Sequence, residues 1–160
     1  MNTVDILRVE LCFSVLDENS KGNCISTQQG PYSTYEPNKS TSNGYNGLWL
    51  SGSTFNNPEP HEDGLENRFS VIYGFKDLAQ LYAWFEADIL SLNEAGFKVS
   101  TYRVPEENVE YGRRQVQYQP GEAELVSIES IREAIHDVYF TDEFQDAVIN
   151  YMRNTNRATY

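Results

Sequence analysis

The first part of the chain alternates between apolar and polar side chains. The odd positions from Leu7 to Val15 are apolar, and Arg8, Glu10, Cys12 and Ser14 fill the even positions. A period of two is typical of a strand that has one face in the core and the other in solvent. We therefore expect a strand over this segment, with Arg8 directed outward and paired with Glu10 or another acid.

The alternation is lost between residues 17 and 67, where Asn, Ser, Gly, Pro and Thr dominate. So long a segment without a regular pattern is unusual in a compact domain. It is either a functional loop region that contains short strands or a partly disordered segment. Its tyrosines and its tryptophan argue against complete disorder.

Regular patterns return after residue 67. The helix signal is clearest at Asp77, which is followed three residues later by Gln80 and then by apolar residues at helical spacing. The pattern predicts either two helices, the second over residues 86–95 with a stop at Gly96, or one helix bent near Glu86. Three further segments are predicted as strands: residues 68–75, 97–104 and 114–118. Residues 105–112 are expected to form a connection, and residues 124–128 a last strand or a lead into a helix.

Two amphipathic helices are predicted near the carboxyl terminus. Ser130 and Glu133 form a capping box, and Thr141 precedes two acids that favour the start of a helix. Apolar stripes follow both signals, which is typical of helices that pack on a core. The sequence therefore predicts an α+β fold: a small mixed or antiparallel sheet, a central helical segment and two carboxyl-terminal amphipathic helices.

The length of 160 residues fits a single domain over residues 1–160. Within it we expect an α+β core over residues 1–118, which contains the long polar segment at 17–67, and a helical extension over residues 119–160. No apolar run approaches the roughly 18–20 residues of a membrane span, and the amino terminus lacks the features of a signal peptide. These observations predict a cytoplasmic protein that does not bind membranes.

The net charge is strongly negative, with 24 acidic and 12 basic side chains and a formal charge of −12. Such a surface repels phosphate backbones and anionic lipids, so we expect no direct binding to nucleic acid. A partner with a basic surface is favoured instead. The single basic pair, Arg113 and Arg114, is a candidate for binding an anion, although neutralisation of nearby acids is the better interpretation.

Metal and cofactor motifs are missing from the sequence. Two cysteines, Cys12 and Cys24, are too far apart for a redox pair or a structural zinc site. His61 stands beside Glu62 and Asp63 but has no second histidine at helical spacing, so a solvated loop is the better interpretation. We expect neither a metal nor a cofactor.

Two stretches, FSVIYGFKDLAQLYAWF at residues 69–85 and GFKVSTYRVPEENVEYGRRQVQY at residues 96–118, carry a family resemblance. They resemble small uncharacterised phage and prophage proteins, which share a Gly-Phe strand and a final Gly-x-x-Gln-Val strand. GPYSTYE at residues 30–36 is similar to an earlier element of that family. The resemblance covers about half of the chain, excludes the last forty residues, and implies the cytoplasm of an infected bacterium but no activity.

A looser similarity links the chain to the ADP-ribosyltransferase fold. In those enzymes an arginine on the first strand holds the dinucleotide, and a glutamate on a late strand stabilises the oxocarbenium-like sugar. Arg8 matches the first position, while Gln115 and Gln117 lie where the late-strand pair is expected, with Gln117 in place of the glutamate. An amide offers no negative charge to that transition state. The replacement of the glutamate by Gln117 therefore argues against transfer of ADP-ribose. Gln115 and Gln117 are otherwise expected to be solvent-facing strand residues.

Three functions are compatible with these features. The first is an inhibitor or counter-defence factor whose negative surface occupies a basic groove of a host enzyme that handles nucleic acid. Its contacts are expected from the long polar segment and from nearby acids: Tyr32, Tyr35, Tyr45, Trp49, Glu59, Glu62 and Asp63. The second is a divergent ADP-ribosyltransferase that binds NAD with Arg8, Gln115 and Gln117, with Tyr32 or Ser33 shaping the pocket. The third is a structural or assembly component of a phage.

Overall fold

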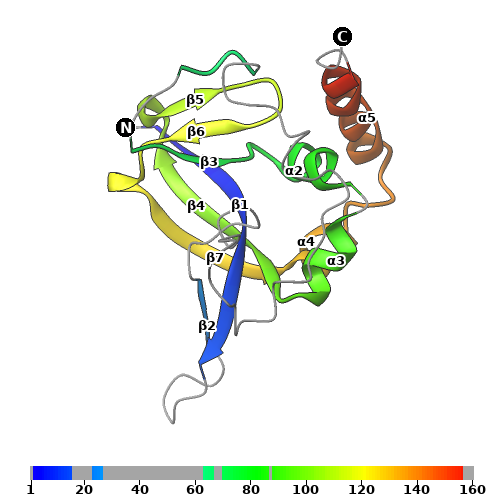
Figure 1. Cartoon of the computed structure of the whole chain (residues 1–160), viewed down its shortest axis with the longest axis horizontal. Coiled ribbons are helices and arrows are strands. Elements are labelled where there is room, and N and C mark those ends of the chain that lie inside the picture. The colour runs from blue at the N-terminus through cyan, green and yellow to red at the C-terminus, as the bar shows by residue number, and fades with distance from the viewer. Residues whose placement is uncertain (1, 16–22, 27–62, 67–69, 87, 157–160) are drawn as a thin grey trace, which may run out of the picture.

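A four-stranded antiparallel sheet forms the centre of the fold. The computed structural model describes residues 2–15, 23–26, 63–66, 70–86 and 88–156 (Figure 1). The strand order of the main sheet is β2-β1-β4-β7, and every neighbouring pair is antiparallel. Its strands are β1 (Thr3–Val15), β2 (Asn23–Ser26), β4 (Phe97–Pro105) and β7 (Glu124–Ser130). β2 lies within the long polar segment. This agrees with the first of the two alternatives for that segment, a loop region that contains short strands.

A second, three-stranded sheet joins the main sheet through β1. Its antiparallel strands, in the order β3-β6-β5, are β3 (Ile72–Gly74), β6 (Val116–Tyr118) and β5 (Val109–Tyr111). Leu7 and Phe75 exchange two backbone N–H···O bonds of 2.8 Å each and connect the two sheets. The neighbouring Gly74 is required here, because a Cβ at this position would lie 2.8 Å from the Leu7 carbonyl oxygen.

The helices begin where their capping signals predict. They are α2 (Leu78–Phe85), α3 (Asp88–Glu94), α4 (Ile131–His136) and α5 (Asp142–Asn156). Asp77 Oδ1 accepts a 2.8 Å bond from the Gln80 amide, and Ser130 Oγ accepts a 3.0 Å bond from the Glu133 amide. Each capping side chain satisfies an amide that the first turn of its helix leaves unpaired. α2 ends at Phe85 with Glu86 as its cap, so the prediction of two helices is confirmed.

Both faces of β1 are buried, which differs from the prediction of a strand with one solvent face. Val9 and Leu11 on one face pack with α2, α3 and α4 in a core that includes Leu81 and Ile131. Ile6 on the other face belongs to a second core, which contains residues of β4 and β6. The small sheet covers this second face, and the sequence of β1 alone gives no signal of that layer. Arg8 and Glu10 are therefore enclosed rather than solvated, with exposed side-chain fractions of 13% and 1%.

The α+β class is confirmed, with three differences of detail. The sheet is divided into two antiparallel sheets. Residues 105–112, predicted as a connection, include a short 3-10 turn, η2 (Glu106–Asn108), and the strand β5. The segment 119–160 is more than a helical extension, since it begins with the 3-10 turn η3 (Pro120–Glu122) and then adds β7 to the main sheet. In the part of the chain that the structure describes, every helix is too short or too polar to cross a bilayer.

Candidate functional site

Four elements, η2, β5, η3 and β7, bring a group of carboxylates together beside the amino terminus. β4 leads into η2, while η3 leads into β7, so both 3-10 turns lie at the same end of the main sheet (Figure 1). The Gln119 amide donates to the Asn108 carbonyl at 3.1 Å, and Asn108 Nδ2 donates to Glu122 Oε2 at 3.5 Å. We call this region the acidic end, and its carboxylates are Glu106, Glu107, Glu110, Glu122 and Glu124.

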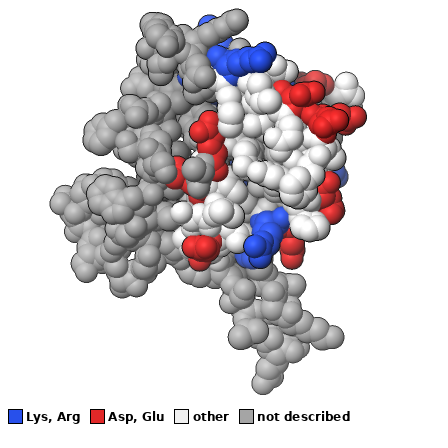
Figure 2. Space-filling view, turned by 90° about the vertical axis from the view of Figure 1, so that its right-hand side faces the viewer, with Lys and Arg blue, Asp and Glu red and all other residues white. Residues whose placement is uncertain are grey.

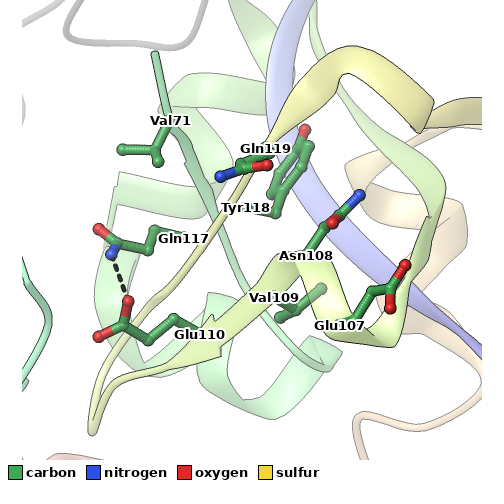
Figure 3. Close-up of a pocket in the computed structure, with 8 residues that line it drawn as sticks. All are labelled: Val71, Glu107, Asn108, Val109, Glu110, Gln117, Tyr118 and Gln119. Atoms are coloured by element: carbon green, nitrogen blue, oxygen red, sulfur yellow. Dashed lines mark hydrogen bonds between the residues drawn. The ribbon is translucent and has the colours of Figure 1, made fainter. Parts of the chain in front are cut away.

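A cavity of about 190 Å³ opens at the acidic end (Figure 3). Its walls are formed by β5, β6, η2 and the residue before β3. The lining residues are Val71, Glu107, Asn108, Val109, Glu110, Gln117, Tyr118 and Gln119. Two carboxylates and three amides dominate this lining, so the cavity is rich in hydrogen-bond acceptors.

Gln117 fixes one wall of the cavity. Its Nε2 donates to Glu110 Oε2 at 2.8 Å and to the Glu66 carbonyl at 3.0 Å, and Glu110 Oε1 accepts from the Glu66 amide at 3.1 Å. Only 1% of Gln117 is exposed, and its Oε1 has no hydrogen-bond partner among the described residues. The expectation of a solvent-facing Gln117 is therefore wrong. The residue instead holds Glu110 in place on the neighbouring strand.

Tyr118 forms the inner wall of the cavity. Burial of the phenol raises the pKa of Tyr118 to about 12, with Arg8 lowering it and Glu10 raising it. Burial dominates because the phenolate loses its hydration in this environment. Tyr118 is consequently a neutral side chain at physiological pH, and the negative charge of the cavity comes from its carboxylates.

The arrangement suits a cation that carries N–H donors. Carboxylate and amide oxygens accept hydrogen bonds from guanidinium and ammonium groups, and a carboxylate partner strengthens such bonds. The described residues contain no cluster of three or more His, Cys, Asp or Glu side chains that could hold a metal ion. The cavity therefore offers hydrogen-bond acceptors to a guanidinium or ammonium group.

The sequence of residues 1–132 matches the family model described as the bacteriophage T4 Y00F protein. The chain belongs to this phage protein family. The match includes both sheets, α2, α3 and every residue that lines the acidic cavity, and it reaches further than the expected half of the chain. Comparison with the curated proteins and with the solved structures gave no match.

Within residues 1–132, which match the family model, the adjacent Arg113 and Arg114 lie in different environments. Arg113 is exposed, whereas Arg114 is 5% exposed and forms an ion pair with Asp63, with 2.5 Å between Arg114 Nε and Asp63 Oδ1. Gln115 Nε2 donates to Asp63 Oδ2 at 2.9 Å. Asp63 is thus buried and fully engaged, although the sequence indicated a solvated loop that contacts a partner. Gln115 is also buried, which corrects its expected solvent exposure.

Arg8 does pair with Glu10, as predicted, but in a buried setting. The distance from Arg8 Nε to Glu10 Oε2 is 3.1 Å, and Tyr102 donates its hydroxyl to Glu10 Oε1 at 2.7 Å. The side chain of Ser100, opposite Arg8 on β4, is buried as well. These residues lie on the same face of the main sheet as Ile6, beside the second core.

The structure does not assemble the site that the transferase similarity implied. Val116 and Tyr118 point from β6 toward the core that contains Ile6, while Gln117 points to the opposite face of the same strand. Arg8 lies on the Val116 and Tyr118 side of that strand, because a Cβ at Gly74, which pairs with Val116, would lie 3.2 Å from Arg8 Cγ. Arg8 and Gln117 are therefore separated by the small sheet. The arrangement gives no support to an ADP-ribosyltransferase-like fold.

Most of the predicted partner contacts fall on residues that lie outside the described part of the chain. These are Tyr32, Tyr35, Tyr45, Trp49, Glu59 and Glu62. Ser33, which was predicted to shape a pocket for NAD, also lies outside the described residues. Sequence reasoning in turn missed Glu107, Asn108 and Glu110 as parts of one cavity. The available signal was Gly112, which separates two segments of alternating polarity and marks a hairpin. Such a hairpin places Glu110 directly opposite Gln117, as the β5–β6 register does.

Proposed function

We propose that this phage protein acts by protein–protein interaction, with the acidic end binding a basic surface of a host protein. The observation that carries the proposal is the cavity between Glu107 and Glu110, which is built from acceptors and carries negative charge. A lysine or arginine of the partner would enter it, and the surrounding carboxylates would attract the basic surface from a distance.

The distribution of charge over the described surface supports this proposal. Fifteen Asp and Glu side chains are exposed, against five Lys and Arg side chains. The five basic residues are Lys76, Arg103, Arg113, Arg132 and Arg153. Of these, Arg103 is the one that borders the acidic end, where it pairs with Asp5 at 3.2 Å. The acidic end therefore keeps most of its negative charge.

A host enzyme that handles nucleic acid is the class of partner that fits best. Such enzymes carry basic grooves for phosphate backbones, and an acidic protein that occupies the groove excludes the nucleic acid. The protein would then act as an inhibitor or counter-defence factor in the cytoplasm of the infected bacterium. This mode of action requires neither a cofactor nor catalysis.

The test is affinity capture from lysate of a bacterial host, with three forms of the full chain compared. The wild type is compared with a Glu106→Gln/Glu107→Gln variant and with a Glu94→Gln/Glu143→Gln variant. The four glutamates changed in these two variants are all exposed. Both variants lose two negative charges, but only the first loses them at the acidic end. We expect one basic protein to be retained by the wild type and by the Glu94/Glu143 variant, and to be released by salt.

For the Glu106/Glu107 variant we expect binding to the captured protein to weaken by about fivefold, which corresponds to about 1 kcal/mol for two partly exposed charges. Equal weakening in both variants would show that overall charge, rather than the acidic end, drives association. Affinity that does not change between low and high salt would exclude the electrostatic mechanism.

A further inference from the structure

β7 is an open edge of the main sheet. It is the last strand in the order β2-β1-β4-β7, and among the described strands none pairs with its outer side. β7 has seven residues, whereas the other edge strands, β2, β3 and β5, have three or four each. It contains neither the proline nor the lysine that commonly protects such an edge, and its first four residues are exposed. An edge of this length is able to pair with a further strand.

The outer side of β7 presents backbone groups at Ile128. Leu7 directs its N–H and C=O to Phe75, away from β4. Because bonded residues alternate in an antiparallel pair, the next residue of β1 bonds to Ser100 on β4. Ser100 therefore points away from β7, and Ile128, which lies opposite Ser100, points away from β4. Ile128 thus presents one donor and one acceptor to an additional strand.

A bulge in β7 brings two carboxylates onto the same face of the sheet. Val126 is an extra residue between two pairs of the β4–β7 register. Without it, Glu124 and Glu129 would lie on opposite faces, since they are an odd number of positions apart. With it, they pair with residues of β4 that are four positions apart, on the face that bears the helices. Leu125, which is 43% exposed, and Ile128 lie on the opposite face.

The charge around this edge is negative. β7 and η3, the turn before it, contain three glutamates and no lysine or arginine. When β4, the first turn of α4 and the Asp5 partner of Arg103 are included, acids still exceed bases. The acids are Asp5, Glu122, Glu124, Glu129 and Glu133, and the bases are Lys98, Arg103 and Arg132. A second copy of a chain with a net charge of −12 would be repelled here, whereas a basic segment would be attracted.

We infer that the free edge of β7 binds a basic, extended segment of a partner protein as an additional antiparallel strand. The backbone of the segment would bond to the N–H and C=O of Ile128. Lysine or arginine residues four positions apart would face Glu124 and Glu129, and apolar residues between them would cover Leu125. Glu124 also belongs to the acidic end, so the inference rests on the proposed function and specifies how a basic partner would be held there.

Negative charge alone does not distinguish this edge from the rest of the surface. Figure 2 shows acidic side chains in several separate places on the helix side of the chain as well, and a basic segment would be attracted to each of them. The edge of β7 adds backbone hydrogen bonds, which have a direction. A test of strand addition must therefore change the backbone of the bound segment without changing its charge.

Two peptides with methylated backbone nitrogens provide this test. The parent probe is acetyl-Thr-Lys-Val-Thr-Val-Lys-Thr-amide, which has its lysines four positions apart and its valines on the other face. Methylation of both valine nitrogens removes the N–H groups that would point at β7, and methylation of both lysine nitrogens removes N–H groups that would point away. In titrations of the full chain followed by NMR, we expect the valine-methylated peptide to bind about tenfold more weakly than the parent. The lysine-methylated peptide should bind within about threefold of the parent.

Two further measurements locate the site on the chain. The Ile128 amide faces solvent in the free chain, so its hydrogen exchange should slow when the parent peptide binds. The Glu124→Gln/Glu129→Gln variant should bind the parent peptide about fivefold more weakly, because two partly exposed charges are lost. The matched control is Glu94→Gln/Glu143→Gln, which loses two exposed charges elsewhere and should bind like the wild type.

Equal affinities of the two methylated peptides would overturn the inference, because binding would then depend on charge alone. A parent peptide that does not bind at about 1 mM would also overturn it. So would unchanged exchange at Ile128, or a chain that dimerises by itself through β7. These probes require no host protein. A host protein captured at the acidic end, together with equal affinities of the methylated peptides, would therefore support the proposed function and exclude strand addition.

Discussion

Asp63 and Arg114 form an ion pair that is almost completely closed to solvent, with exposed side-chain fractions of 0% and 6%. The pair joins the end of the long polar segment to the residues that enter β6. The Arg113 amide reinforces the link by donating to the Asp63 carbonyl at 3.2 Å. Fifty-one positions separate the two charged residues in the sequence, so only the folded chain brings them together.

Loss of the Asp63 charge is expected to destabilise the protein. Asp63→Asn leaves the buried Arg114 guanidinium without its counter-charge, and breaking such a pair costs about 3 kcal/mol or more in the free energy of unfolding. Urea denaturation of the variant measures this loss. Asp5→Asn is the control, because Asp5 and Arg103 are each 50% exposed and such a pair contributes less than about 1 kcal/mol. Similar losses in both variants would contradict the structural role of the buried pair.

Enlargement of Gly74 is expected to weaken the junction of the two sheets. In Gly74→Ala the new methyl group would lie 2.7 Å from Ile6 Cγ2 and 2.8 Å from the Leu7 carbonyl oxygen. The strands must separate to admit it, which costs about 1–3 kcal/mol. Thermal unfolding monitored by circular dichroism reports the change. Gly121→Ala, where the added methyl group meets nothing within 4 Å, should unfold like the wild type.

Removal of the Asp77 side chain is expected to weaken α2 and its contact with α5. Asp77 Oδ1 caps α2, and Oδ2 accepts a hydrogen bond of 3.1 Å from the Tyr151 hydroxyl. Asp77→Ala should lower the free energy of unfolding by about 1–2 kcal/mol, and Asp77→Asn should retain most of the cap. Urea denaturation distinguishes the two variants. If both lose the same stability, the charge of Asp77 matters rather than its capping bond.

The raised pKa of Tyr118 makes stability depend on alkaline pH. The unfolded tyrosine titrates near 10.0 and the folded one near 12, so between these values the folded chain binds more protons. The free energy of unfolding therefore falls as the pH rises from about 10 to about 12, by as much as about 3 kcal/mol from this residue.

Urea denaturation at several pH values from about 9 to about 12 tests this dependence. Tyr118→Phe should lose part of the slope, and Tyr73→Phe, at a residue 36% exposed, should keep it. An unchanged slope in Tyr118→Phe would show that other groups cause the alkaline loss of stability.

Local patterns determined much of this fold. Three of its signals are local: the alternation in β1, the caps at Asp77 and Ser130, and the stop near Glu86. Each depends on residues within one or two turns of a helix or one or two steps along a strand. Such signals predict the type of an element, and the structure confirms the type of each one and the starts of α2 and α4. β1, however, begins at Thr3 rather than at Leu7. The family resemblance also lay in contiguous segments, so the sequence alone was sufficient to reveal it.

The tertiary structure decided which polar residues are buried and which of them meet. Gln117 and Arg114 appear in the sequence as ordinary polar residues of a strand and its approach. The hairpin signal at Gly112 places Glu110 opposite Gln117, but nothing near Arg114 indicates that Asp63, fifty-one positions away, will pair with it. Burial of a polar group depends on what covers it, and here the covering segments come from distant parts of the chain. The acidic cavity arises in the same way, because it lies between elements that only the complete fold places side by side.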